Sequence, residues 1–158
     1  MEKLLSSPFY IEHGNRLLES YKLLTGNDLL PPSLDDNESG MSVIERLQNA
    51  PFVVLSHGIE DEPIFNFANN KALALFEISW DEVIKMPSRL SAETINQTER
   101  EYLLNTVSRQ GYIDNYSGVR ISAKGRRFMI NKAVVWNIID AKSNYYGQAA
   151  MFSQWDFL

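Results

Sequence analysis

The sequence of 158 residues contains no cysteine. Disulfide bonds, thiolate metal sites and cysteine nucleophiles are therefore excluded. It also lacks any apolar run long enough to cross a lipid bilayer. Near the N-terminus, Ser6, Ser7 and Pro8 interrupt what would otherwise be the core of a signal peptide. We therefore expect a cytoplasmic protein with no membrane partner.

An excess of positive charge is also lacking. Fifteen Lys and Arg residues stand against twenty Asp and Glu residues, which gives a net charge of −5. That sign is wrong for a surface that neutralises phosphates, so no nucleic-acid partner is expected. The basic residues Lys124, Arg126 and Arg127 lie together, but such a cluster is typical of a solvated hairpin end.

The length fits one domain with an N-terminal addition. Leu17, Leu18, Tyr21 and Leu24 have helical spacing and Gly26 follows them, which predicts a helical extension over residues 1–25. Residues 26–41, "GNDLLPPSLDDNESGM", are typical of a linker. We therefore expect the main domain at 42–158, with the N-terminal helix as an appendage outside its core.

Within 42–158, two short apolar runs at 52–67 predict a hairpin, and several short helices follow. A capping-box pattern at Thr98 and Glu101 predicts the start of a helix that ends near Gly111. The remainder predicts strands at 112–122, 126–140 and 145–157. On the second of these, strict alternation would place five apolar residues on one face: Phe128, Ile130, Val134, Trp136 and Ile138. The order predicts an α+β fold with a five-stranded antiparallel sheet and short helices on one face.

The stretch "FNFANNKALALFEISWDEV", residues 65–83, changes from strand-like to helix-like spacing at Asn69-Asn70. An Asn at such a junction satisfies backbone groups as a helix N-cap, so Asn69 is predicted to be a structural joint. Ser79 and Glu82 form a capping box that starts the next helix.

This stretch resembles the segment of PAS domains in which the second strand ends in an Asn and enters the first helix. Over nearly the whole chain, "APFVVLSHG", "MPSRLSAE", "RQGYIDNYSGVRIS", "VVWNIID" and "YYGQAAMFSQWDFL" resemble the MEKHLA domain, a PAS-related family. That family occurs as small stand-alone bacterial and algal proteins, the type expected here, and at the C-terminus of plant homeodomain–leucine-zipper transcription factors. The resemblance implies a PAS-like sensory, ligand-binding or interaction module without a defined reaction.

No cofactor is expected. Flavin–cysteine photochemistry and attachment of a cinnamoyl chromophore both need a cysteine, and the chain has none. Haem-binding PAS domains commonly use a His on the long helix before the last strands, whereas "EREYLLNTVSRQ" contains no His. His57 beside Glu60, Asp61 and Glu62 would make a poor metal site, so no metal is expected either.

Candidate pocket residues are polar side chains that interrupt apolar strand patterns, together with a cation on the helical side and an aromatic residue. For each, solvent exposure or pairing with a nearby acid is the alternative, and for the tryptophan a place in the core. The candidates are His57, Asn66, Arg89, Tyr116, Arg120, Asn131, Trp136, Asn137 and Gln148.

The sequence favours a non-enzymatic sensor that binds a small ligand, a protein partner or both. One alternative is a pure interaction module that forms a homodimer or binds a protein partner. Its surface would be the N-terminal helix and the aromatic tail: Phe9, Tyr10, Leu17, Leu18, Tyr21, Trp155 and Phe157. A lesser alternative is a small acid/base enzyme in a cone-shaped α+β fold, using His57 or Asp114. No matched acid and base accompany them in the sequence.

Overall fold

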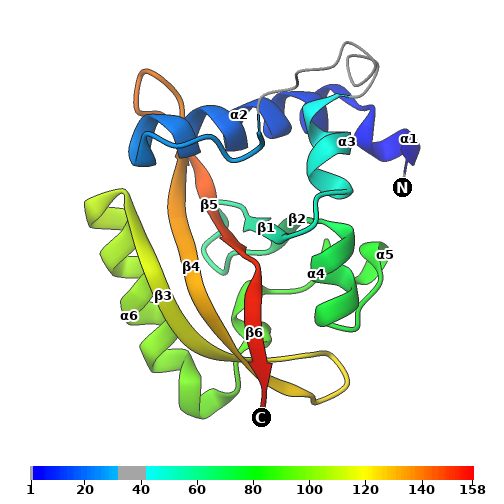
Figure 1. The fold of residues 1–158 in the computed structure, drawn as a ribbon, viewed down its shortest axis with the longest axis vertical. Helices are drawn as coiled ribbons and strands as arrows, with labels where there is room; N and C mark the ends of the chain where they lie inside the picture. Colours follow the sequence, from blue (N-terminus) through cyan, green and yellow to red (C-terminus); the bar gives the residue numbers. More distant parts are fainter. Residues whose placement is uncertain (1, 32–41) are drawn as a thin grey trace.

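A computed structural model describes residues 2–31 and 42–158 of the chain (Figure 1). The α-helices are α1 (Glu2–Leu5), α2 (Pro8–Thr25), α3 (Val43–Gln48), α4 (Asn70–Leu75), α5 (Trp80–Val83) and α6 (Thr94–Gln110), with a 3₁₀ turn, η2 (Ser88–Ser91). The strands are β1 (Val53–His57), β2 (Phe65–Ala68), β3 (Tyr112–Ile121), β4 (Arg127–Ile139), β5 (Tyr145–Phe152) and β6 (Gln154–Phe157). Within the described residues, no helix combines the length and apolar character that a membrane span requires.

The strands form one antiparallel sheet in the order β2-β1-β5-β4-β3. The strand predicted at 145–157 is interrupted at Ser153, and its last part is a sixth strand, β6. β5 pairs with the second half of β4, whereas β6 pairs with Phe128–Asn131 in the first half. The expected α+β architecture is confirmed, with this one addition to the five strands.

Helix α2 is part of the core. It lies across one end of β4 and β5 (Figure 1), where Tyr10, Leu17 and Tyr21 are buried in the same apolar cluster as Trp136. The Trp136 indole N–H donates to the Ser20 hydroxyl at 3.0 Å. The expectation of an appendage outside the core is therefore wrong, because the apolar face of this helix covers the sheet.

A β-bulge divides β4 into two parts. Lys132 has a φ of 52°, and the pairing with β3 shifts register nearby. Phe128 and Ile130 pack toward α4, whereas Trp136 and Ile138 join the cluster under α2. The prediction that these residues share one face is wrong, because the extra residue at the bulge reverses the alternation that follows it.

Asn69 ties four segments together and is completely buried. Its side-chain oxygen accepts from the backbone N–H groups of Ala72, at the start of α4, and Val54 on β1. Its amide group donates to the carbonyl oxygens of Leu47, in α3, and Phe52. The side chain thus uses all four of its hydrogen-bonding positions to join α3, β1, β2 and α4.

Capping boxes were predicted at the starts of two further helices, α5 and α6, and the structure confirms only the first. Ser79 caps α5, and its hydroxyl donates to the Glu82 carboxylate while accepting from the Glu82 N–H. Helix α6, however, begins at Thr94 with Glu93 as its N-cap, so Thr98 lies inside the helix. The capping box predicted at Thr98 and Glu101 is wrong, because a motif of this kind also occurs by chance within helices.

The predicted boundaries at 25/26 and 41/42 stay predictions. Most of the predicted linker, residues 32–41, lies outside the described residues. Of the part that is described, Leu29 and Leu30 are buried in the cluster under α2.

Candidate functional site

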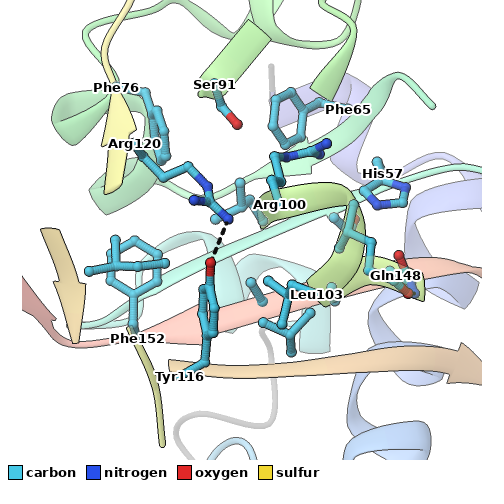
Figure 2. A pocket seen from close by; sticks show the side chains of 17 residues that line it. His57, Phe65, Phe76, Ser91, Arg100, Leu103, Tyr116, Arg120, Gln148 and Phe152 are labelled. Atoms are coloured by element: carbon cyan, nitrogen blue, oxygen red, sulfur yellow. Dashed lines mark hydrogen bonds between the residues drawn. The ribbon is translucent and has the colours of Figure 1, made fainter. Parts of the chain in front are cut away.

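A cavity of about 60 Å³ lies between the sheet and α6 (Figure 2). On β4 it is lined by Ile130 and Val135, whereas Trp136 and Ile138 belong to the cluster under α2. Its walls are mostly apolar and include Phe65, Phe76, Leu103, Ile130 and Phe152. Polar lining residues come from five elements: Ser56 and His57 on β1, Ser91 on η2, Arg100 on α6, Tyr116 and Arg120 on β3, and Gln148 on β5. An apolar cavity with a few convergent polar groups is the usual form of a small-molecule site.

Arg120 is buried and is partly neutralised. One guanidinium nitrogen donates to the Val119 carbonyl at 2.8 Å and another to the Tyr116 hydroxyl at 3.2 Å, the contact drawn in Figure 2. The Tyr116 hydroxyl in turn donates to the Glu99 carboxylate at 2.8 Å. Glu99 itself is 4.0 Å from Arg120 and has a half-exposed side chain. Burial raises the pKa of Tyr116, so its hydroxyl keeps its proton at neutral pH.

Arg100 is buried with less compensation. It is 7% exposed and donates one hydrogen bond, to the Ser88 hydroxyl at 2.7 Å. No carboxylate in the described part of the chain forms an ion pair with it. Burial, and then the nearby charge of Arg120, lower the pKa of Arg100 to about 10. The side chain still carries its charge at neutral pH.

His57 is neutral and has one free ring nitrogen. Its Nδ1 lies 3.1 Å from the Gly58 carbonyl oxygen, an acceptor, so the ring proton belongs on Nδ1. Nε2 is then a lone-pair acceptor, and among the described residues it has no hydrogen-bond partner, although Gln148 lies beside it. Burial lowers the pKa of His57, and the charge of Arg100 lowers it further against the effect of the Gly58 carbonyl.

Gln148 and Asn137 connect the sheet to α6. The Gln148 amide donates to the Leu104 carbonyl at 3.0 Å and to the Asn137 side-chain oxygen at 3.1 Å. Asn137 donates to the Val107 carbonyl at 3.0 Å. These bonds hold the C-terminal half of α6 over one end of the cavity.

A larger hollow of about 410 Å³, the outer hollow, adjoins the cavity and is lined in part by the exposed Arg89 and Tyr145. The two share four lining residues, His57, Arg100, Leu104 and Gln148. These side chains therefore form the wall between the cavity and the surface. Movement of this wall would open a route for a ligand from solvent.

The structure brings together four of the nine candidate residues at the cavity: His57, Tyr116, Arg120 and Gln148. Asn137 lies next to them behind Gln148. The other four lie elsewhere. Asn66 contacts Ser56 on the α2 side, Asn131 donates to Asp156 on β6, Trp136 is buried under α2, and Arg89 pairs with Glu62 in the outer hollow. The bulge in β4 accounts for the placement of Trp136.

Arg100 was not among the candidates. Arg100, Leu103 and Val107 have the spacing i, i+3 and i+7, and all three are buried on one face of α6. This spacing was available in the sequence and would have indicated an arginine within an apolar helix face.

The site offers no evident acid/base pair. His57 is neutral, and its polar neighbours in the cavity are guanidiniums and an amide; Glu60, the carboxylate that acts on its pKa, does not line the cavity. Asp114 is exposed on β3 and does not line the cavity. Within residues 2–31 and 42–158, no group of three His, Asp or Glu side chains comes together in a way that could hold a metal ion.

Comparison with known proteins extends these observations. The family model of the MEKHLA domain matches residues 11–157. The chain is similar to the homeobox-leucine zipper protein HOX10 of Oryza sativa subsp. indica, with 27% identity covering 89% of this chain and 16% of that protein. It is also similar to ATHB-9 of Arabidopsis thaliana, with 23% identity covering 99% of this chain and 19% of that protein. The chain thus spans less than one fifth of the length of these two relatives.

Two solved structures share the fold. The PAS domain of a protein from Colwellia psychrerythraea superposes with a TM-score of 0.59 and 13% identity, covering 78% of this chain and 98% of that one. The LOV domain of the blue-light photoreceptor Aureochrome1 gives a TM-score of 0.56 and 15% identity, covering 81% and 88%. At such identities the comparison shows a common fold of the PAS and LOV type.

Proposed function

The chain belongs to the MEKHLA domain family, and we propose that it is a PAS-like sensory module that binds a small ligand in the cavity between the sheet and α6. The observation that carries this proposal is the cavity itself. It combines apolar walls with polar side chains that include His57, Tyr116, Arg120 and Gln148 from the sheet and Arg100 from α6. Burying such polar groups has a cost in free energy, which a bound ligand would offset.

Strand β4 connects the cavity to the opposite face of the sheet. Val135 lines the cavity, and the next residue, Trp136, packs under α2, where it bonds to Ser20 and stacks edge-on against Tyr21 at 5.0 Å. Displacement of β4 by a ligand would therefore change how α2 packs on the sheet. We propose that ligand occupancy is transmitted to α2 in this way.

The module acts without catalysis in this proposal, because the cavity supplies no acid and base in reach of each other. The proposed place of action is the cytoplasm. The similar proteins named above are plant homeobox-leucine zipper proteins, in which the matched region is a minor part.

We expect no flavin, haem or metal. A cavity of about 60 Å³ is far smaller than the roughly 300–1,000 Å³ typical of sites for drug-sized molecules. Without a cysteine, a flavin–cysteine adduct could not form. The expected ligand is therefore small.

Native mass spectrometry of the purified protein, followed by thermal-shift measurements with a broad metabolite set, tests the proposal. A retained small molecule, or a compound that raises the melting temperature in proportion to the logarithm of its concentration, would support it. Absence of both, over neutral and charged compounds alike, would refute ligand binding.

A second candidate function, protein interaction through α2, is favoured by its outward face. Phe9, Ile11 and Leu23 are 49%, 44% and 58% exposed, whereas Tyr10, Leu17 and Tyr21 are buried against the chain's own sheet. Phe9 and Leu23 lie on the same side of α2 by helical spacing, so a homodimer or partner contact would use these two. Sedimentation of the wild type against a Phe9→Ser, Leu23→Ser variant tests it, since these exposed changes leave the core intact. An unchanged molecular mass would count against a homodimer.

A further inference from the structure

The cavity contains more buried positive charge than the chain compensates. Arg100 and Arg120 both line it, and each is 7% exposed. Glu99 lies 4.0 Å from Arg120 and has a half-exposed side chain. Glu101 is exposed on α6, and its charge has the smallest of the effects on the pKa of Arg100. No described carboxylate is paired with Arg100.

Buried arginines are ordinarily paired with an acid, because an isolated buried charge is costly. Arg100 has five N–H groups and donates one hydrogen bond, to Ser88. Figure 2 shows Arg100 between Arg120 and His57. Both arginines line the same cavity, and the charge of Arg120 is near enough to lower the pKa of Arg100. A guanidinium with free donors beside a second one is suited to an anionic partner.

The rest of the cavity indicates what kind of anion fits. Phe65, Phe76, Leu103 and Phe152 form apolar walls that would not solvate an inorganic ion such as phosphate. The volume of about 60 Å³ is well below the about 150 Å³ of a cavity that holds benzene, so the apolar part has only a few carbon atoms.

We propose that the cavity binds a small organic carboxylate, whose anionic group accepts hydrogen bonds from Arg100 and Arg120 and whose short apolar body packs against the aromatic walls. This inference rests on the proposed ligand-binding function and names the class of the ligand. The carboxylate completes the set of partners that Arg100 lacks within the chain. Entry is from the outer hollow, past the wall that contains Arg100 itself.

The test compares acids with neutral molecules of the same shape. Propionate and butyrate are titrated against propionamide and butyramide, and the arginine side-chain Nε–H resonances of the wild-type protein are followed by NMR. We expect saturable shifts of the Arg100 and Arg120 signals with the acids. The amides should bind about ten- to a hundredfold more weakly, because they lack the charge-assisted hydrogen bonds.

Substitutions identify the cations. Arg100→Met and Arg120→Met should each weaken binding of butyrate about tenfold or more. Arg109→Met is the matched control: Arg109 is on the same helix but is exposed, and it makes one long hydrogen bond, to the Asn105 carbonyl. It should leave the affinity unchanged. Should a buried variant not fold, the wild-type arginine resonances still decide the question.

Several results would overturn the inference. Equal affinity for acids and amides would show that the cavity binds ligands without using its cations, and equal affinity for inorganic phosphate would show that the apolar walls play no part. If the acids fail to bind while a neutral metabolite binds in the cavity, the inference fails and the proposed function stands. If no compound of either kind binds, both fail.

Discussion

Replacing Arg100 by methionine is expected to make the ligand-free protein slightly more stable. Methionine keeps much of the length of the side chain and can fill the apolar part of its site. It removes a charge that is buried without an ion-pair partner among the described residues. Replacing a buried ionic group by a well-packed apolar one often leaves the stability of the fold unchanged or raises it.

The magnitude follows from two opposing effects. A pKa of about 10, in place of the ordinary 12.5, corresponds to about 3 kcal/mol against the charged form in the folded state. The hydrogen bond to Ser88, which the variant loses, is worth about 2 kcal/mol as a bond from a charged donor. The variant should therefore gain about 1 kcal/mol in free energy of unfolding, or about 2–4 °C in melting temperature.

Urea unfolding at pH 7, followed by circular dichroism, measures this difference, with Arg109→Met as the control that should change nothing. The slope of the transition must match the wild type for the comparison to hold. A loss of more than about 2 kcal/mol would refute the reasoning, because it would show that Arg100 stabilises the ligand-free fold. Arg100 would then be a residue that stabilises the fold, rather than one whose charge is compensated only when an anion binds.

Asn69→Ala should lower the free energy of unfolding by about 3 kcal/mol or more, because it leaves buried backbone groups of four segments without partners. Urea unfolding measures this change, and a loss below about 1 kcal/mol would contradict the prediction. Gly147→Ala should prevent stable folding at 37 °C, since a Cβ there would lie 2.0 Å from the His57 carbonyl oxygen and φ is 134°; a normal melting curve would contradict it. His13, buried and bonded to Ser56, has its pKa lowered to about 4 by burial and then by a nearby arginine. The unfolded chain binds that proton near pH 6.5, so stability should fall by up to about 3 kcal/mol from pH 7 to pH 4. Unfolding curves of wild type and His13→Gln that stay parallel over this range would show that His13 does not titrate as described.

Local patterns predicted much of the fold. Alternation and capping preferences placed the β1–β2 hairpin and the start of α5, because these features depend on neighbouring residues. The bulge at Lys132 was not predicted, since the residue with positive φ is a lysine rather than a Gly or Asn; the pairing of β4 with its neighbouring strands holds it in place. The packing of α2 on the sheet was missed for a related reason, because an apolar helix face does not identify its partner.

Local sequence patterns also predicted part of the site. His57, Tyr116, Arg120 and Gln148 stood out as polar residues within apolar strands, and the cavity contains all four. Arg100 was passed over because a charged residue on a helix is ordinarily exposed. Its burial depends on how α6 lies against β3 and β4, which is a tertiary arrangement that spacing alone does not determine.

The bulge in β4 has a consequence for how such a protein can diversify. It separates the strand into a half that faces the helices around α4, with Phe128 and Ile130, and a half whose Trp136 and Ile138 support α2. The bulge keeps Ile130 and Val135 on the cavity side, so these side chains can change without replacing the residues that support α2. Deleting Lys132, in contrast, would exchange inside for outside along the second half and bring Trp136 toward the cavity. Relatives with altered ligand preference are therefore expected to differ at cavity-facing positions on both sides of the bulge, such as Ile130 and Val135, and to retain the length of the strand.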